Sequence, residues 1–386
     1  MERLNDTYDH MIFCRDSITG KMMEIDLNNG EARPCKEMEN VKEMPFTGPG
    51  LIDLQINGIK GIDFNIPSLS EAEILEATEY LLSQGVTSYF PTVITNSDEN
   101  IIAILQTIQS ACSAHAIVQE CIGGIHLEGP FISPKEGAKG AHDEKYIKAP
   151  DWDLFNKFQA AAGGRIKIIT LAPEWEGTGF FIEKCKANGV LVSIGHSLAN
   201  TEQIANAVTA GAMMSTHLGN AIPLLLPRHP NLIWDQLAAE DLFTCLIADG
   251  IHIPDSFIRT VIKVKGDKTL IISDATCFAG MAPGEYNSHI GGTVILDNEK
   301  RISLKGTPGL LAGAAKSLLE NVETLIDHKV STLGNAWEMA SENVAALLKQ
   351  YFGEFPARND RVIFTIREGK IIIGKVFKSG RLVFEG

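Results

Sequence analysis

The chain has 386 residues, of which 45% are hydrophobic, with 34 lysines and arginines against 48 aspartates and glutamates. This length exceeds the size at which a single core usually stops growing, so we expect one large domain with a small appendage. The net charge of −14 argues against nucleic acid or an anionic membrane as the main partner, because phosphates would be repelled on average.

Seven cysteines are scattered along the sequence without any C-x-x-C pair. This pattern is more typical of buried, reduced thiols than of a disulfide framework or a thiolate metal site. The first residues lack the apolar core of a signal peptide, and no apolar run reaches about 18 residues. We therefore expect a cytoplasmic protein without a membrane segment.

Both ends of the chain read as β structure. Short apolar pieces alternate with turn signals in residues 1–47, and the alternation is cleaner in residues 361–386. Because chain termini commonly lie close together, residues 1–47 and 355–386 are predicted to pair into one small, β-sandwich-like domain. Residues 48–354 then form the main domain.

The main domain alternates between apolar runs and helix-like segments such as 70–83 and 201–210. Eight such alternations are the pattern of a (β/α)8 barrel, the TIM barrel of the α/β class. The alternative is a doubly wound open sheet, but no run precedes a G-x-G-x-x-G or P-loop sequence. The predicted strands are LIDLQIN (51–57), TSYFPTV (87–93), IGGIHLE (122–128), KIITLAP (167–173), LVSIGH (191–196), MMSTHL (213–218), FTCLIAD (243–249) and LIISDA (270–275).

The sequence after the last predicted strand is less regular. Residues 297–305 are predicted to form an irregular or hairpin excursion. Residues 306–326 indicate a glycine-rich loop that opens a helix, and residues 336–352 indicate a further helix.

Residues 190–221 are central to the functional hypothesis. They read as strand, helix and strand, with His196 and His217 at the ends of the two strands and Asn200 or Thr201 as the helix cap. In a parallel sheet the carboxyl ends of such strands lie on the same edge, so the two imidazoles can converge.

A single histidine at a strand end is more often a hydrogen-bonded structural residue than a metal ligand. Two histidines in successive units, together with Glu128 at the corresponding position upstream, favour a metal site. Two nitrogen ligands and one oxygen ligand, with an open fourth position, are what a catalytic zinc-like site needs.

Further polar residues follow other strands, namely Gln55, Asn57, Asp249 and Asp274. In a barrel, this rim carries the active site. An isolated aspartate such as Asp274 could equally cap a helix or pair with a cation. Beside a metal-activated water it can accept a proton and later deliver it to a leaving group, which is the chemistry of hydrolysis.

Seven motifs stand along the chain in this order: PGLIDLQINGIKGIDFN (49–65), GIHLEGPFISP with GAKGAH (124–142), SIGHS (193–197), THLGNA (216–221), ADGIH (248–252), SDAT (273–276) and GLLAGAA (309–315). In order and approximate spacing they resemble those of N-acetylglucosamine-6-phosphate deacetylases. These enzymes belong to the amidohydrolase superfamily of metal-dependent TIM-barrel hydrolases. The resemblance covers residues 49–315 well and the two ends only loosely.

The resemblance implies that Glu128, His196 and His217 bind one divalent metal ion and that Asp274 is the catalytic acid and base. Zinc is favoured, although iron, cobalt and manganese accept the same ligand types. It also implies a small-molecule sugar phosphate as substrate and a homodimer, in which a residue of one subunit can reach the phosphate pocket of the other. The residues it places at the sugar phosphate are Ala141, His142, Asn220, Ala221, Arg228, Asp249, His252, Leu311, Ala312 and Gly313.

Chemistry supports a role for two of these residues apart from the resemblance. An acidic protein that holds a phosphate needs a fixed guanidinium in its pocket, which Arg228 can supply. His142 could bind the substrate or instead polarise the amide oxygen.

The sequence also departs from the family pattern. Many amidohydrolases carry His-x-His after the first strand, whereas this chain has Gln55 and Asn57 there, which indicates a vestigial second metal position and a single-metal site. Gly219 stands where the family usually has an aromatic residue, and Ile222 where it usually has methionine. Because these residues border the substrate, the exact sugar stays open.

The leading hypothesis is hydrolysis of N-acetylglucosamine 6-phosphate to glucosamine 6-phosphate and acetate. A second hypothesis is an amidohydrolase for another N-acyl compound or a cyclic amide; Arg228 should matter strongly for a phosphorylated sugar and little for a neutral substrate. A third is a catalytically silent relative that serves as a binding protein. The intact predicted ligands and Asp274 argue against it, because loss of a ligand would be expected first.

Overall fold

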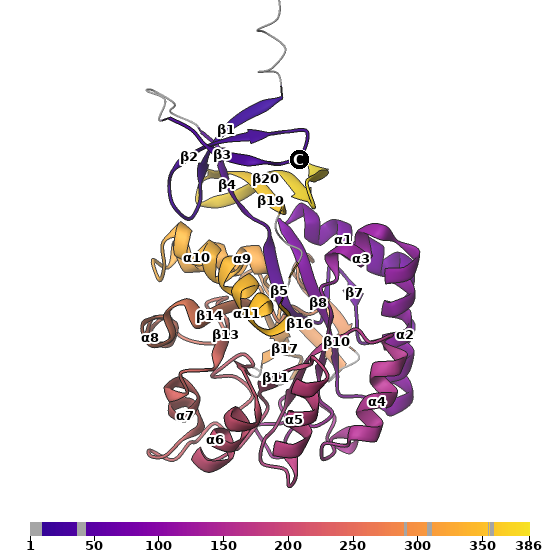
Figure 1. Ribbon diagram of the computed structural model, residues 1–386. Coiled ribbons are helices and arrows are strands. Elements are labelled where there is room, and N and C mark those ends of the chain that lie inside the picture. Colours follow the sequence, from indigo (N-terminus) through magenta and orange to yellow (C-terminus); the bar gives the residue numbers. More distant parts are fainter. Residues whose placement is uncertain (1–9, 37–43, 289–291, 307–310, 354, 356–358) are drawn as a thin grey trace, which may run out of the picture.

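The computed structural model describes residues 10–36, 44–288, 292–306, 311–353, 355 and 359–386. Its centre is an eight-stranded parallel sheet, and a parallel bridge between Ile56 and Ala275 joins the first strand to the end of the last (Figure 1). This closure confirms the predicted TIM barrel. In their order around the sheet, the strands are β5 (Leu51–Ile56), β8 (Val86–Ile94), β9 (Ile125–Glu128), β10 (Ile166–Leu171), β11 (Leu191–Ile194), β12 (Met214–Ser215), β13 (Phe243–Ile247) and β14 (Thr269–Ile272).

Helices surround the barrel (Figure 1). Among the described residues, none is both long and apolar enough to cross a lipid bilayer. The helices are α1 (Glu71–Ser83), α2 (Asp98–Ala114), α3 (Ala116–Cys121), α4 (Trp152–Ala161), α5 (Thr178–Ala187), α6 (Thr201–Ala210), α7 (Leu232–Ala238), α8 (Asp255–Lys265), α9 (Leu318–Asp327), α10 (Leu333–Met339) and α11 (Glu342–Phe352), with 3-10 turns at Glu144–Tyr146 and Gly266–Lys268.

Local sequence explains where α6 starts. The Asn200 side chain accepts a hydrogen bond from the backbone of Gln203, and the Gln203 side chain accepts one from the backbone of Asn200. This reciprocal capping box satisfies two amides that a helix start otherwise leaves unpaired. Of the two predicted caps, Asn200 is confirmed, and Thr201 is the first residue of the helix.

The single helix predicted for 336–352 is wrong, because the chain breaks it into α10 and α11. Ser341 has non-helical backbone angles, and its hydroxyl donates to the carbonyl of Trp337. The carbonyl of Ala340 accepts a hydrogen bond from the amide of Ile52 in β5. The end of α10 is thus fixed by a contact with the barrel that no local pattern encodes.

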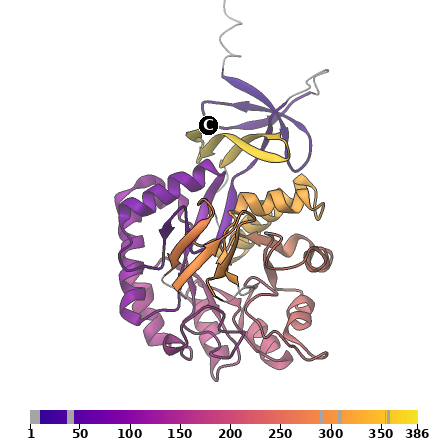
Figure 2. The same cartoon turned by 180° about the vertical axis from the view of Figure 1, so that it is seen from behind.

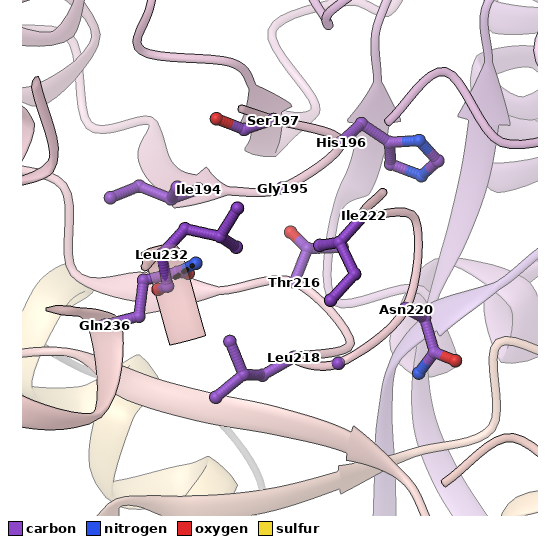
Figure 3. A pocket seen from close by; sticks show the side chains of 11 residues that line it. Ile194, Gly195, His196, Ser197, Thr216, Leu218, Asn220, Ile222, Leu232 and Gln236 are labelled. Carbon is purple, nitrogen blue, oxygen red and sulfur yellow. Dashed lines mark hydrogen bonds between the residues drawn. The ribbon is translucent and has the colours of Figure 1, made fainter. Parts of the chain in front are cut away.

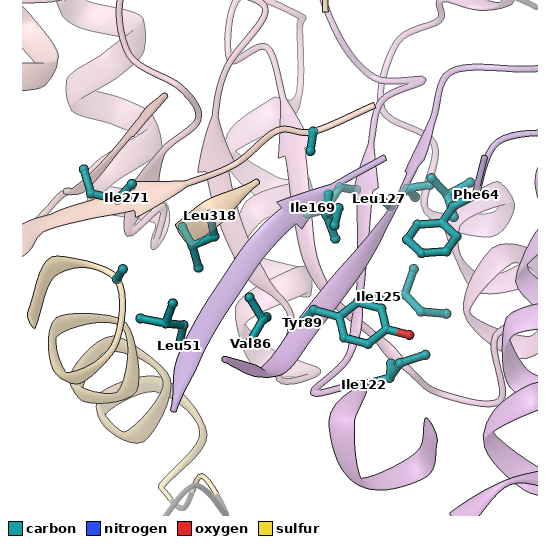
Figure 4. Close-up of a cluster of buried hydrophobic side chains, with 14 of the residues drawn as sticks. Leu51, Phe64, Val86, Tyr89, Ile122, Ile125, Leu127, Ile169, Ile271 and Leu318 are labelled. Carbon is teal, nitrogen blue, oxygen red and sulfur yellow. The ribbon is translucent and has the colours of Figure 1, made fainter. Parts of the chain in front are cut away.

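The hydrophobic core has two layers because successive strand residues point to opposite faces. Ile52 and Leu54 of β5 lie in the cluster that fills the barrel. Leu51 lies in the larger cluster between strands and helices, part of which Figure 4 shows with Tyr89 of β8 and Leu127 of β9. Both faces of the barrel strands are therefore buried, which explains their nearly continuous apolar runs.

A four-stranded antiparallel sheet follows the last barrel strand and covers part of the barrel in the view of Figure 2. It consists of β15 (Gly284–Ser288), β16 (Gly292–Leu296), β17 (Arg301–Leu304) and β18 (Leu311–Ala314). The predicted excursion at 297–305 is its β16–β17 turn and strand β17. The loop predicted from residue 306 instead contains β18, while 307–310 lie outside the described residues. A bridge from Ala314 to Ala275 attaches β18 to the carboxyl rim of the barrel.

The two ends of the chain form one seven-stranded sheet beside the barrel (Figure 1). Cys14 and Ile25 from the amino-terminal strands share a buried cluster with Ile363 and Phe377 from the carboxyl-terminal strands, which makes the sheet sandwich-like. The domain bounds 1–47, 48–354 and 355–386 stay predictions. In sheet order the strands are β21 (Arg381–Glu385), β20 (Lys370–Lys378), β19 (Arg361–Arg367), β4 (Phe46–Pro49), β1 (Met11–Asp16), β2 (Met22–Asp26) and β3 (Ala32–Pro34).

The terminal sheet contacts the amino ends of the barrel strands. A side chain at Gly85, just before β8, would lie 3.3 Å from Val362 and Ile373. The buried ammonium of Lys378 donates to Asp360 at 2.7 Å and to Ser88 of β8 at 3.1 Å. This end is opposite to the rim where the predicted ligands lie. A hairpin of β6 (Gly58–Ile59) and β7 (Ile62–Asp63) follows β5 on that rim.

Candidate metal centre and active site

The structure brings the three predicted ligands together at the carboxyl rim of the barrel. Glu128 is the last residue of β9, and His196 and His217 each follow a strand by two residues. The two Nε2 atoms lie 3.2 Å apart, and they are 3.3 and 3.2 Å from Glu128 Oε1. All three side chains are buried.

The hydrogen bonds of His196 define its tautomer. Its Nδ1 lies 2.9 Å from the carbonyl oxygen of Ala138, which can only accept. Nδ1 therefore carries a proton, and in the neutral imidazole Nε2 presents a lone pair to Glu128 and His217. Electron-rich nitrogen and oxygen atoms that converge in a buried space repel one another unless a cation lies between them. The donor set of two imidazoles and one carboxylate suits a divalent transition metal.

Charges within the cluster are strongly coupled. Burial would raise the pKa of Glu128, but the hydrogen bonds and positive charges that His196 and His217 supply when protonated outweigh burial and hold that pKa well below its ordinary value. Burial would lower the pKa of His217, but its hydrogen bond to Glu128 and the charge of Asp274 raise it. The carboxylate is therefore ionised at neutral pH, as a metal ligand must be.

The side-chain amide of Gln55 joins Asp274 to the cluster, and the side-chain amide of Asn57 also binds Asp274. Gln55 Nε2 donates to Glu128 Oε1 at 2.7 Å and to Asp274 Oδ1 at 3.0 Å, and Asn57 Nδ2 donates to Asp274 Oδ1 at 2.8 Å. Burial and the nearby charge of Glu128 raise the pKa of Asp274 to about 6. At the predicted vestigial metal position, Gln55 thus donates to both carboxylates and Asn57 donates to Asp274.

The backbone is strained where these side chains leave the barrel. His196, His217 and Asp274 have φ angles of 50°, 26° and 48°, in the left-handed region that residues other than glycine rarely adopt. Such strain persists only where the surroundings enforce it, and it is concentrated at functional sites.

His142 lies against the same cluster. Its Nδ1 is 2.8 Å from Thr95 Oγ1, its Nε2 is 3.9 Å from Glu128 Oε2, and its ring centroid is 4.5 Å from that of His196. Burial lowers its pKa to about 3. The preceding residue, Ala141, is exposed.

Asp249 and His252 form a tight turn after β13. Asp249 Oδ1 accepts the amides of Ile251 and His252, and its Oδ2 lies 2.7 Å from His252 Nδ1. Burial would raise the pKa of Asp249, but the hydrogen bond with His252 outweighs burial and lowers it. The carboxylate therefore fixes the orientation of the His252 ring.

The remaining predicted contacts lie at two other places. Asn220 and Ala221 are half-buried just after His217, and the Asn220 amide donates to the His217 carbonyl at 3.2 Å. Arg228 is exposed in the loop that follows. Three more predicted contacts are half-buried on β18, namely Leu311, Ala312 and Gly313.

A small cavity lies between the ends of β11 and β12 and helix α7 (Figure 3), with room for a group about the size of one water. It extends from His196 and Asn220 to Gln236, whose Oε1 is buried without a hydrogen-bond partner among the described atoms. Gly219 forms part of its wall with a φ of 97°, and a side chain there would lie 3.2 Å from Ile253 and Phe257. A larger side chain at this position would be strained by that φ and would require these neighbours to move.

Sequence reasoning missed a buried polar layer below the predicted ligands. His126 Nδ1 lies 3.0 Å from the Leu54 carbonyl, and its Nε2 lies 2.7 Å from Thr170 Oγ1, which in turn contacts Thr216 Oγ1 at 2.7 Å. Burial lowers the pKa of His126 to about 4. Strand alternation could have revealed this layer. Residues two apart in a strand share a face, and His126 precedes Glu128 by two, so both side chains point into the barrel.

Comparison with known proteins gives a consistent result, although no family model matches the sequence. The chain is 33% identical over 303 residues to the N-acetylglucosamine-6-phosphate deacetylase of Bacillus subtilis (strain 168), which covers 78% of this chain and 74% of that protein. It is 32% identical over 317 residues to the enzyme of that name from Haemophilus influenzae, with 80% of each chain covered. A crystal structure of the Pasteurella multocida enzyme of that name superposes with a TM-score of 0.81 at 27% identity, covering 97% of this chain and 100% of that one. The chain therefore belongs to the family of N-acetylglucosamine-6-phosphate deacetylases.

Proposed function

We propose that this protein is a metal-dependent hydrolase that converts N-acetylglucosamine 6-phosphate to glucosamine 6-phosphate and acetate. One observation carries the chemistry: Glu128, His196 and His217 converge at the barrel rim, and the Gln55 amide joins Glu128 to Asp274. Family membership supplies the substrate, because the relatives are named for it.

Glu128, His196 and His217 are the proposed ligands of one divalent metal ion. Zinc suits two imidazoles and a carboxylate, and iron, cobalt and manganese accept the same donors. When bound, such an ion polarises the acetyl carbonyl and lowers the pKa of a water molecule. A second ion is disfavoured, because the neutral amides of Gln55 and Asn57 present N–H donors where a second ion would need ligands.

Asp274 is the proposed general acid and base. It would take a proton from the attacking water and deliver it to the amine that leaves. Both amide donors bind its Oδ1, so they fix the carboxyl group and leave Oδ2 to exchange the proton. The Gln55 amide also holds this carboxylate next to Glu128, within the site.

The sugar phosphate would lie across the rim, between the His142 turn, Asn220 and Ala221, the Asp249–His252 turn and strand β18. His142 either binds the substrate or polarises its amide oxygen. Arg228 is exposed in this chain, so we propose that it reaches the phosphate site of a second copy in a homodimer. Leu224 and Leu225, which are 101% and 90% exposed in the same loop, support such an interface.

A cytoplasmic location completes the proposal. All seven cysteines are free, and five of them are buried. Free thiols in this number are typical of a reducing compartment.

Asp274→Asn tests the assignment of the acid and base. Asparagine keeps an oxygen that can accept from Gln55 and Asn57 but cannot carry the proton, so turnover should fall by about 10²–10⁴-fold while metal content stays at the wild-type value. Steady-state kinetics and metal analysis on the same samples measure both quantities. Undiminished turnover with metal bound would reject the role of Asp274.

A further inference from the structure

Glu174, in the segment between β10 and α5, binds the turn that directly follows His196. Its Oε2 accepts the Ser197 hydroxyl at 2.6 Å, and its Oε1 accepts the Leu198 amide at 2.8 Å. The Ser197 oxygen in turn accepts the Ala199 amide at 2.9 Å. Both carboxylate oxygens of Glu174 thus accept hydrogen bonds from the two residues that follow His196.

His196 is held from its other side by the segment after β9. Its carbonyl accepts the Ser133 amide at 2.9 Å, and its Nδ1 donates to the Ala138 carbonyl at 2.9 Å. Between these two anchors the backbone of His196 has a φ of 50°, which a histidine does not favour by itself. The conformation that directs Nε2 to Glu128 therefore depends on contacts outside its own strand.

We propose that Glu174 is a positioning residue of the metal centre. By fixing the turn from His196 to Leu198, it keeps Nε2 of His196 within the ligand cluster before metal arrives. Charge-assisted hydrogen bonds are suited to this task because they are shorter and stronger than neutral ones. The inference rests on the proposed function, since it requires that the cluster binds a divalent metal ion.

Three variants separate this role from a general effect on folding. Glu174→Ala removes both hydrogen bonds, and Glu174→Gln keeps an acceptor for the Leu198 amide. Glu176→Ala is the matched control, because Glu176 is an exposed carboxylate in the same segment. Ser197→Ala removes the hydroxyl contact with Glu174 and the acceptor for the Ala199 amide but keeps the bond from the Leu198 amide to Glu174, and it serves if Glu174→Ala does not fold.

The measurement is the zinc dissociation constant, obtained by competition with a chromophoric chelator, together with thermal unfolding of each protein with and without zinc. Glu174→Ala should bind zinc about 10–100-fold more weakly, as is usual when a group that orients a ligand is removed. Glu174→Gln and Ser197→Ala should show smaller losses, and Glu176→Ala none. Zinc should also raise the melting temperature of Glu174→Ala less than it raises that of the wild type.

Two results would overturn the inference, and they are distinguishable. If the wild type binds zinc and Glu174→Ala binds it equally tightly, Glu174 has no positioning role, although the proposed function stands. If the wild type itself binds no divalent metal ion, the proposed function fails and the inference fails with it.

Discussion

Buried carboxyl groups differ in this barrel according to what surrounds each one. Glu128 is ionised because two imidazoles contact its Oε1, whereas no described residue forms an ion pair with Asp53. Asp53 Oδ1 accepts the amide of Ser273 at 3.1 Å, and its Oδ2 is buried without a partner among the described atoms. Burial accordingly raises the pKa of Asp53 to about 7.

The raised pKa of Asp53 predicts how the free energy of unfolding changes with pH. The folded pKa of Asp53 lies above its ordinary value of 3.8, so the folded chain binds more protons than the unfolded chain between about pH 4 and 7. The stabilisation by this group is complete below pH 4 and is lost as the pH rises through 7, by up to about 1.4 kcal/mol per pH unit. Asp53→Asn should remove that decline. Denaturant unfolding of both proteins at pH 5 and pH 8 measures it, and a stability difference that does not change with pH would contradict the assignment.

At the scale of single residues, the positions of polar residues at strand ends predicted which side chains would converge. Glu128, His196 and His217 could be placed together from sequence, because a parallel sheet sets all carboxyl ends on one edge. The contact of Glu174 with Ser197 could not be predicted, since it joins two loops whose conformations no pattern specifies. The bridge from Gln55 to Glu128 and Asp274 likewise depends on the closure of the barrel, which brings residues 73 and 219 positions apart into contact.

At the scale of elements, local and tertiary signals differ in what they determine. The start of α6 could be predicted because Asn200 and Gln203 cap it within four residues. The break between α10 and α11 carries no glycine or proline and arises from the contact of Ala340 with Ile52. Strand β18 has glycine and alanine in a pattern that also suits a loop, and only its pairing with β17 and Ala275 makes it a strand.

The cap of α6 gives the prediction at this scale. Asn200→Ala removes the acceptor for the Gln203 amide and should lower the free energy of unfolding by about 1 kcal/mol. Asn200→Asp keeps an oxygen acceptor and is the control, with little or no loss expected. Chemical denaturation at one pH compares the three proteins. Equal losses in the two variants would show that the side-chain cap does not stabilise the helix.

At the scale of the whole molecule, the alternation of strands and helices predicted the barrel, and the β patterns at both ends predicted their common sheet. The hydrogen bonds between β4 and β19 confirm that pairing across more than 300 residues of sequence. The proposed homodimer could not be derived in this way, because the pattern within one chain does not show which part of its surface would contact a second copy.

The proposed homodimer is tested through the exposed leucines. Leu224→Glu combined with Leu225→Glu places two charges in the proposed interface and should convert a species of twice the chain mass to a monomer. Phe180→Glu, at an exposed hydrophobic residue of α5, is the control and should leave the mass unchanged. Light scattering after size-exclusion chromatography measures the mass. A monomeric wild type, or a double variant that stays dimeric, would contradict the proposed interface.

The most direct measurement for the whole account is acetate release by the zinc-loaded protein from N-acetylglucosamine 6-phosphate, compared with N-acetylglucosamine and an N-acetyl amino acid at equal concentration. Rapid release from the phosphorylated sugar, with little from the other two, is the predicted result. No release from the phosphorylated sugar, with one zinc ion bound per chain, would contradict the proposed activity. Equal release from the unphosphorylated sugar would contradict the proposed recognition of the phosphate.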